Sequence, residues 1–407
     1  MQNKKVLSED LLRFQIVSDP QINSEGTSIL FSKRVVNSKN KTVSHLFTVD
    51  LNHKVTQWTQ GESVNTFGRW SSDGSNVAFI SMREEKKFQI YLISTSGGEA
   101  KKVTDLPEGV LSYFKWSPDS KKIVFIFREG LQEFTEKAKK EREEKGLSQP
   151  PFIIETGWHR LDGEGYFGHA RNAIYCLDIQ TNKYHKIYDH CKMGFYSLDW
   201  LPDSQSLLVS HSVQPNPWGK KIDDRIFRVY LDGKSEELRG LPKGRKAEVL
   251  CSPDGTWFSY LGNEDELDHF GSKNLNLYLS DFNGKTVSCL TQNQDYCLGA
   301  WSISDTNDMK CSEITHWDPS GRGIFVSLCQ HGESQVGFLD LKEKNIKPLT
   351  KGKHTVLIGN VSSDGKKMGC VYTTPVAIGE IGVLDLDQGA GGVRVLTSFN
   401  KEYLESI

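Results

Sequence analysis

A short turn motif recurs along the whole chain, and it constrains the fold more than any other feature of the sequence. Each copy opens on an aromatic or apolar residue, carries Ser or Pro in the middle and ends on Gly or Ser. Six copies begin at Trp70, Trp116, Trp200, Cys251, Trp317 and Val361, and a degenerate seventh covers Ile22–Gly26. Ser, Pro and Gly in this order are the preferences of a type I β-turn. A fixed turn repeated at intervals of tens of residues is typical of a repeat architecture.

Short apolar runs flank every copy of the motif. In the second unit, Val77–Ile80 follows the motif, Ile90–Ile93 comes next, and a short segment closes at Val103–Thr104. Together with the run before the motif, each unit holds four short strands joined by tight turns, which is one blade of a β-propeller. The seven units therefore predict an all-β, seven-bladed β-propeller of four-stranded antiparallel blades. A sandwich of three-strand repeats is the alternative, but it has no reason to repeat its turn sequence.

The spacing of the motifs predicts where extra segments lie. The interval from Asp119 to Asp203 is much longer than one blade, so blade three carries an insertion at about 129–165. Smaller insertions are expected near Asn263–Ser272 and Thr291–Ser312. The predicted organisation is an N-terminal arm at 1–13, a propeller at 14–397 and the start of a linker at 398–407. Each blade draws its strands from contiguous sequence, so the first and last blades should meet through side-chain packing.

The aromatic residue that heads the motif has two interpretations. Trp residues recur at the same place in the blade at positions 70, 116, 200 and 317. We expect them to fill the wedge between neighbouring blades, because they repeat blade by blade. A ladder of Trp side chains that serves as a ligand platform is the less favoured alternative.

The insertion of blade three contains a predicted helix at Leu131–Lys145, which Gly146 and Pro150–Pro151 terminate. Its apolar stripe is narrow, so a solvated arm is one interpretation. The other is an arm over the rim of the propeller that guards a cavity or meets a partner. In that case Glu143 and Glu144 are candidates to bind a cationic group, such as a peptide amino terminus.

The loop that follows the helix mixes aromatic, cationic and acidic groups with several glycines. Trp158, Arg160 and Asp162 are its candidate substrate-gating residues, because binding residues concentrate on loops that a rigid scaffold positions. An Arg160–Asp162 pair that only holds the loop together is an equally supported interpretation.

Composition excludes several classes of function. A net charge of −2 offers no basic footprint for nucleic acid. The sequence holds neither an apolar signal core at its start nor a run of membrane-spanning length, so we expect a cytoplasmic protein that does not bind membranes. The eight cysteines lack Cys-x-x-Cys pairs and zinc-like spacing, so no metal or cofactor is expected. Whether Cys289, Cys297 or Cys311 pair stays open.

Three landmarks accompany the turns and resemble one family. Ser8–Ile22 is similar to the start of blade one, His159–Tyr166 to an Arg-x-Asp-Gly-x-Gly loop, and Leu396–Leu404 to the propeller exit. The family is the prolyl oligopeptidase family of serine peptidases, in its acylaminoacyl-peptidase branch. The resemblance covers the whole chain and is to the amino-terminal propeller. The turns alone are shared with TolB-like propellers.

This resemblance implies a partner, because family members continue into an α/β-hydrolase domain that carries catalytic Ser, Asp and His. It places the start of that domain near Ile407, and the sequence holds no Gly-x-Ser-x-Gly nucleophile elbow. We therefore expect no catalytic residue here and no activity of the chain by itself. The implied function is a non-catalytic propeller that gates short peptides for an acylaminoacyl-peptidase-like serine peptidase, with its insertion on the face that meets the hydrolase domain.

Two other classes remain as alternatives. The first is a stand-alone TolB-like propeller for protein–protein interaction. The second is an enzyme that holds a metal in the propeller channel, but the strands show no recurring inward acidic position. Apolar residues outside the blades predict an exposed patch, through which the chain self-associates into a homo-oligomer or binds a separately expressed hydrolase domain of the same family. These are Leu11, Leu12, Phe14, Phe399, Tyr403 and Leu404.

Overall fold

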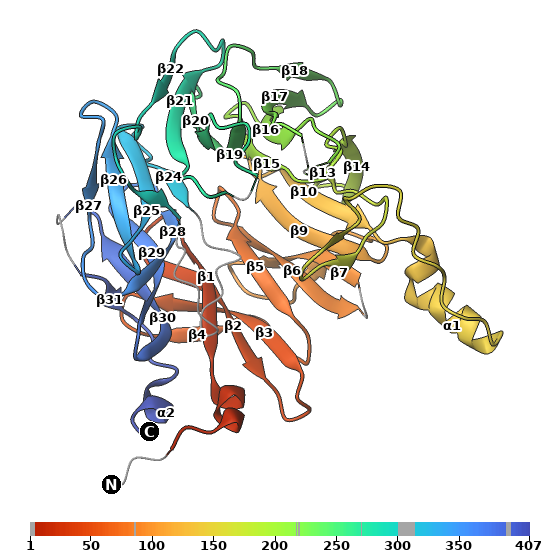
Figure 1. Cartoon of the computed structure of the whole chain (residues 1–407). Helices are drawn as coiled ribbons and strands as arrows, with labels where there is room; N and C mark the ends of the chain where they lie inside the picture. Colours follow the sequence, from red (N-terminus) through yellow and green to blue (C-terminus); the bar gives the residue numbers. More distant parts are fainter. Residues whose placement is uncertain are drawn as a thin grey trace.

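The structure is a computed structural model that describes residues 5–84, 87–216, 218, 220–269, 271–299, 314–387 and 392–407. Its strands form a ring of seven blades, as the repeated turn predicts (Figure 1). Within each blade the pairing is antiparallel and follows chain order from the first strand to the fourth. Successive strands pair in this way because short connections favour antiparallel pairing between strands that follow one another in the chain.

The first four blades come from contiguous sequence apart from the insertion in blade three. Blade one holds β1 (Ile16–Ile22), β2 (Ser28–Val36), β3 (Thr42–Asp50) and β4 (Val55–Gln57). Blade two holds β5 (Asn65–Trp70), β6 (Asn76–Glu84), β7 (Lys87–Ser94) and β8 (Lys101–Lys102). Blade three holds β9 (Gly109–Trp116), β10 (Lys122–Glu129), β13 (Ala173–Asp178) and β14 (Lys183–Tyr188). Blade four holds β15 (Ser197–Trp200), β16 (Ser206–Ser212), β17 (Asp224–Tyr230) and β18 (Ser235–Glu237).

The last three blades follow the same order. Blade five holds β19 (Arg245–Cys251), β20 (Trp257–Asn263), β21 (Asn276–Asp281) and β22 (Val287–Cys289). Blade six holds β23 (Cys297–Leu298), β24 (Thr315–Trp317), β25 (Gly323–Gln330), β26 (Glu333–Asp340) and β27 (Asn345–Pro348). Blade seven holds β28 (Thr355–Val361), β29 (Lys367–Thr374), β30 (Ala377–Asp385) and β31 (Arg394–Val395).

Blade six departs from the simple pattern, because β23 and β24 both pair with β25. The first strand of this blade therefore comes in two pieces. The predicted insertion at Thr291–Ser312 includes β23 and ends before β24, and most of it, with Cys311, lies outside the described residues. The seven cysteines that the structure describes are all free thiols.

The helical segments lie outside the blades. The insertion contains η2 (Gln132–Phe134), α1 (Glu136–Glu144) and a small hairpin of β11 (Arg160–Leu161) and β12 (Gly165–Tyr166). The side chain of Thr135 caps α1 by accepting a hydrogen bond from the Ala138 N–H. A 3₁₀ helix, η1 (Ser8–Arg13), lies in the N-terminal arm, and a short helix, α2 (Lys401–Leu404), follows the last blade. No helix among the described residues has the length and apolar character needed to cross a membrane.

The hydrophobic core lies between the blades. Seven clusters of buried residues each join two neighbouring blades, including one between blade seven and blade one. The first strands of neighbouring blades contact one another, for example β5 with β9 and β15 with β19. A blade buries both of its faces in this arrangement, which explains why its middle strands are continuous apolar runs.

The motif tryptophans join neighbouring blades by hydrogen bonds as well as by packing. The indole Nε1–H of Trp70 donates to the Gln21 carbonyl oxygen at 3.0 Å, across the interface between blades one and two. The next two interfaces repeat this bond, from Trp116 to Arg69 and from Trp200 to Lys115, each at 3.1 Å. This geometry confirms the wedge interpretation of the motif aromatic.

Ring closure uses side-chain hydrogen bonds instead of a shared strand. Asn360 on β28 accepts from the Ile22 N–H at 2.6 Å and donates to the Ile22 carbonyl at 2.9 Å. The Asn400 side chain likewise accepts from the Gln15 N–H at 2.9 Å and donates to the Gln15 carbonyl at 2.8 Å. The predicted closure by side-chain packing is therefore correct but incomplete. Two asparagine side chains also form hydrogen bonds with backbone groups across this interface.

The predicted apolar patch at the termini is only partly exposed. Tyr403 is buried, and its ring lies 5.4 Å from that of Phe14. Phe399 packs against Phe31, and the Lys33 ammonium lies 4.3 Å from the Phe399 ring centroid. The prediction was wrong for these side chains because the two terminal segments pack on each other and on blade one. Leu11 and Leu12 are exposed as predicted.

The Ser and Asp of the repeated motif form one hydrogen-bonded unit. In blade seven the Ser362 hydroxyl donates to Asp364 Oδ1 at 2.7 Å and accepts from the Lys367 N–H at 3.0 Å. The Lys366 N–H also donates to Asp364. These bonds, chiefly the one from Ser362, hold the pKa of Asp364 below its ordinary value of 3.8.

We predict that Ser362→Ala lowers the free energy of unfolding by about 1–2 kcal/mol at pH 7, because a charge-assisted bond is lost and a buried N–H loses its acceptor. A carboxylate whose pKa is lower in the folded state than in the unfolded state stabilises the protein at pH values above the unfolded pKa. This stabilisation is lost as the pH falls through the folded pKa. The difference between wild type and variant should therefore narrow below pH 3.8. Urea unfolding at several pH values measures it, with exposed Ser38→Ala as the control. A difference independent of pH would contradict the role of the carboxylate.

Candidate functional site

The connections between strands divide the ring into two faces. The turns from first to second strand carry the repeated motif, and we call their side the motif face. The connections from second to third strand, and from each blade to the next, lie on the opposite side because the strands are antiparallel. The chain also reaches β1 and leaves β31 on that side, so we call it the terminal face. The insertion, between β10 and β13, departs from the terminal face.

Exposed apolar side chains concentrate on segments of the terminal face. Among the described residues, twelve of the fourteen large exposed hydrophobic side chains belong to its loops, its terminal arm or the insertion. They are Val6, Leu7, Leu11, Leu12, Leu147, Phe152, Ile153, Ile154, Phe195, Trp218, Leu267 and Val376. The other two, Val55 and Val395, lie on the outer strands β4 and β31. Grouped exposed apolar residues of this kind mark interaction surfaces.

The candidate gating residues of the insertion loop differ in their surroundings. Trp158 is only 6% exposed; its Nε1–H donates to the Met193 carbonyl at 2.9 Å, and its ring lies 5.4 Å from that of Phe195. Arg160 on β11 and Asp162 in the hairpin turn are exposed. Trp158 therefore anchors the loop on the next blade connection, while Arg160 and Asp162 face solvent.

An acid other than Asp162 holds this loop. Arg128, at the end of β10, forms a 2.7 Å ion pair with Glu164, and its guanidinium lies 4.8 Å from the Phe167 ring centroid. Among the ion pairs of the residues that the structure describes, none joins Arg160 to Asp162. The loop is thus fastened by Arg128, which the sequence did not single out.

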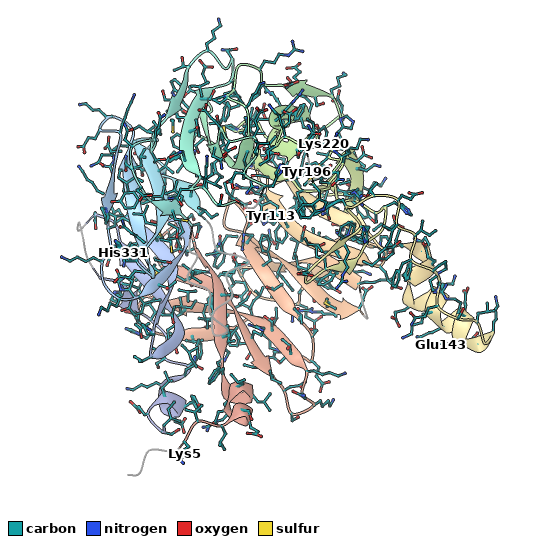
Figure 2. The ribbon with its side chains drawn as sticks, in the orientation of Figure 1. Lys5, Tyr113, Glu143, Tyr196, Lys220 and His331 are labelled. Carbon is teal, nitrogen blue, oxygen red and sulfur yellow. The ribbon has the colours of Figure 1, made fainter. Side chains whose placement is uncertain are left out.

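Glu143 and Glu144 lie on the exposed arm. The arm projects outward from the ring, and Figure 2 shows Glu143 near its tip. Glu143 lies 4.0 Å from Lys139 on the same helix. The structure does not bring these two acids together with Trp158, Arg160 or Asp162, which lie at the base of the insertion.

We predict that limited trypsin digestion cuts the chain first within the arm, at Lys137–Lys145. All residues of α1 are exposed or half-buried, and few apolar contacts hold the segment to the blades. Mass spectrometry of early fragments locates the cuts. A variant with Gln at the basic positions of the arm should resist the first cleavage. First cuts inside a blade strand would contradict this prediction.

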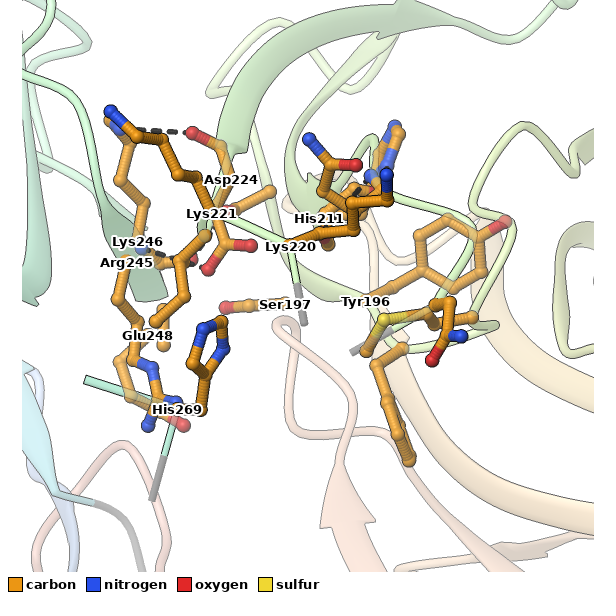
Figure 3. Close-up of a pocket in the computed structure, with 18 residues that line it drawn as sticks. Tyr196, Ser197, His211, Lys220, Lys221, Asp224, Arg245, Lys246, Glu248 and His269 are labelled. Atoms are coloured by element: carbon orange, nitrogen blue, oxygen red, sulfur yellow. Dashed lines mark hydrogen bonds between the residues drawn. The ribbon is translucent and has the colours of Figure 1, made fainter. Parts of the chain in front are cut away.

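A pocket of about 370 Å³ opens on the terminal face between blades four and five (Figure 3). One wall comes from the connection before β15 and the end of β16, through Phe195, Tyr196 and His211. The other wall is the start of β19, through Arg245, Lys246 and Glu248. Further lining residues from the loops of the two blades are Lys220, Lys221, Ile222, Asp224 and His269. Its volume is within the range of small-molecule sites.

The aromatic wall is rigid and uncharged. His211 is buried and stacks on Phe227 with ring centroids 4.8 Å apart. Its Nδ1–H donates to the Ser212 carbonyl at 2.9 Å, which leaves Nε2 to accept from the Tyr188 hydroxyl at 2.9 Å. Burial lowers the pKa of His211, so the ring is neutral at pH 7. Burial likewise raises the pKa of Tyr196.

The wall formed by the start of β19 contains a buried lysine. Lys246 is 6% exposed, and its Nζ donates to the carbonyl oxygens of Asp224 at 2.9 Å and Gly244 at 3.2 Å. The Lys246 N–H donates in turn to the Asp224 carboxylate at 3.1 Å. Burial lowers the pKa of Lys246 and raises that of Asp224. This reciprocal contact ties the start of β17 to the start of β19 and fixes the backbone beside the pocket.

Further cations surround the pocket. Lys220 and Lys221 come from the loop before β17, and Lys221 pairs with Glu266 at 3.2 Å. Arg245 is half-buried, and among the described residues no carboxylate pairs with its guanidinium. The pocket was missed from the sequence, although the doublets Lys220-Lys221 and Arg245-Lys246 were a usable signal. Nowhere in the described chain do three His, Cys, Asp or Glu side chains gather as a metal site would require.

A second pocket, of about 600 Å³, lies where the terminal segments meet blades six and seven. Phe14 and Tyr403 contribute from the two termini, and His354 and Val376 contribute from the blade connections. Both pockets therefore open on the face that carries the exposed apolar side chains.

Comparisons with known proteins agree with this architecture. No family model matches the sequence. The uncharacterized peptidase YuxL of Bacillus subtilis is 26% identical over 406 residues, which cover 98% of this chain and 60% of that protein. The acylaminoacyl peptidase of Pyrococcus horikoshii has a TM-score of 0.74 at 17% identity, over 99% of this chain and 55% of its own.

A propeller without further domains is matched along almost its whole length. The β-propeller domain of the Trilobed protease from Pyrococcus furiosus has a TM-score of 0.61 at 19% identity, over 95% of this chain and 99% of its own. That domain is described as having an open velcro topology. Among the described residues of this chain, the first and last blades share no strand. The chain thus spans only part of its peptidase relatives, and that part is the propeller. The chain is a β-propeller that resembles the amino-terminal propeller of acylaminoacyl peptidases.

Proposed function

We propose that this chain is the non-catalytic, substrate-gating propeller of a serine peptidase that acts on short peptides, and that its terminal face docks onto an α/β-hydrolase domain. The observation that carries the proposal is the concentration of exposed apolar side chains on that face. Both chain termini and the two pockets described above are on the same face. Relatives of this propeller carry a hydrolase domain in cis beyond it, which supports the assignment of the partner.

Gating follows from the rigidity of the ring. Seven blades that bury their cores against one another leave the terminal face as a fixed wall. A hydrolase domain seated on this wall would enclose a space that short peptides enter and folded proteins cannot. The arm of the insertion projects from the rim of the same face, where it would meet the edge of the partner.

A pair of valines tests the docking surface. Val376, in the turn between β29 and β30, is 85% exposed on the terminal face, whereas Val55 is 38% exposed on outer strand β4. We predict that Val376→Asp weakens binding to a separately expressed hydrolase domain of a relative at least tenfold, because a charge would be desolvated in an apolar contact. Val55→Asp is the matched control and should bind as the wild type does.

Size-exclusion chromatography and peptidase activity of the mixture are the measurements. Purified alone, the chain should not hydrolyse acyl-peptide substrates or react with fluorophosphonate probes. Self-association through the terminal face is expected when no hydrolase domain is present, and Val376→Asp should reduce it. A monomeric chain that neither binds the hydrolase domain nor alters its activity would overturn the proposal and favour a stand-alone interaction propeller.

A further inference from the structure

The pocket between blades four and five has an excess of positive charge. Four cationic side chains line it, against two acidic ones, while the chain as a whole carries a net charge of −2. The cations are Lys220, Lys221, Arg245 and Lys246, and the acids are Asp224 and Glu248. A concave site that concentrates one sign of charge attracts ligands of the opposite sign.

Most of these charges already have protein partners. The Lys246 ammonium donates hydrogen bonds to two backbone carbonyls, and the Asp224 carboxylate accepts one from the Lys246 backbone N–H. Lys221 pairs with Glu266. Arg245 differs, because among the described residues its guanidinium has neither a carboxylate nor a carbonyl partner, although it is half-buried beside the loop that contains Gly271. A guanidinium can donate two parallel hydrogen bonds to one carboxylate, which makes Arg the preferred side chain for this group.

One wall of the pocket is largely aromatic and preformed. Phe195, Tyr196 and the neutral ring of His211 line one side, and Ile222 and Ala247 add further apolar lining. Figure 3 shows Tyr196 and His211 on one side of the pocket and Arg245 with Lys246 on the other. The Tyr188–His211 bond and the packing of His211 on Phe227 hold the aromatic side in place without a ligand. The pocket therefore presents an apolar surface opposite Arg245, whose guanidinium has no carboxylate or carbonyl partner among the described residues.

We propose that this pocket binds a carboxylate-bearing apolar residue of a short peptide, with Arg245 pairing with the carboxylate and Phe195 and Tyr196 contacting the apolar side chain. The choice of a peptide rests on the function proposed above, because the pocket opens on the face where peptides would enter. The carboxylate is either the free carboxyl terminus of the peptide or an acidic side chain next to the apolar residue. The propeller would then select peptides by charge as well as by size.

Isothermal titration of the full chain tests this proposal with three probes. Acetyl-Leu-Phe carries a terminal carboxylate, acetyl-Leu-Phe-amide carries none, and acetyl-Glu-Phe-amide carries a side-chain carboxylate. We expect at least one of the two carboxylate-bearing peptides, which we call the acids, to bind at least tenfold more tightly than acetyl-Leu-Phe-amide. The tighter of the two acids identifies the source of the carboxylate.

Two variants locate the binding. Arg245→Gln should abolish the preference for the acids, and Arg245→Lys should restore only part of it, because an ammonium cannot form the paired bonds. Arg322→Gln, at an exposed motif-face position, is the matched control and should keep the full preference. Thermal unfolding of each variant shows whether it is folded. If Arg245→Gln does not fold, binding of the acids to Arg245→Lys is compared instead.

The proposal is overturned if neither acid binds the wild type, if the amide binds equally well, or if a folded Arg245→Gln keeps the preference. No hydrolase domain is present in the titration. A chain that docks the hydrolase domain but shows no preference for acids would therefore reject the carboxylate site alone. A chain that prefers acids but does not dock would reject only the function proposed above.

Discussion

Replacing Trp200 by Ala is expected to lower the free energy of unfolding by about 3–5 kcal/mol, the range for large aromatic truncations in a core. Trp200 is 4% exposed and packs between blades three and four with Val124 and Val209. The substitution opens a cavity in that interface and also removes the hydrogen bond to the Lys115 carbonyl. The ring cannot collapse around the cavity without moving a whole blade, so little of the loss is recovered.

Urea unfolding followed by circular dichroism measures this loss. Trp200→Phe separates the two contributions, because it retains most of the buried volume and removes the indole N–H; a loss of about 1–2 kcal/mol is expected. Trp218→Ala is the control, because Trp218 is 52% exposed, and its effect should stay within about 0.5 kcal/mol. Equal losses at positions 200 and 218 would show that the motif tryptophan is not the wedge between blades.

Replacing Asn400 by Ala should open the ring between blade seven and blade one, at a cost of about 3 kcal/mol. The side chain is buried and satisfies both the N–H and the carbonyl of Gln15, and its Nδ2–H also lies 3.4 Å from Glu380 Oε1. Removing the amide leaves two backbone groups of Gln15 without partners, and each costs roughly 1–3 kcal/mol when buried. The interface has no strand ladder to compensate, because β1 and β31 belong to separate sheets.

Hydrogen exchange distinguishes local opening from a general loss of stability. We expect faster exchange for β1 and for the strands of blade seven in Asn400→Ala, with blades three to five unchanged. Exposed Asn345→Ala on β27 is the matched control. Uniformly faster exchange in all blades, or no change in unfolding free energy, would be inconsistent with a closure that depends on Asn400.

The number of blades, the order of the strands and the role of the motif tryptophans could all be predicted from the sequence. Each depends on local chemistry that repeats. The Ser–Asp hydrogen bond and the turn it stabilises are formed within a few residues, as in Ser362–Asp364. The four apolar runs of a blade alternate with these turns, so only one antiparallel order is open to them. A pattern that occurs seven times also averages out the ambiguity of any single copy, such as the one headed by Val361.

The functional face was decided by the tertiary structure. The pocket joins Tyr196, His211, Arg245 and His269, which come from separate strands and loops and have no common motif. The burial of an aromatic side chain in a loop or terminal segment also depends on residues that are distant in the sequence. Trp158 packs on Phe195, and Tyr403 packs on Phe14 from the other end of the chain. Local sequence determines strands and turns because their hydrogen bonds are short-range in the chain. Burial, pockets and ring closure arise only when blades far apart in sequence meet, so the sequence by itself could not specify them.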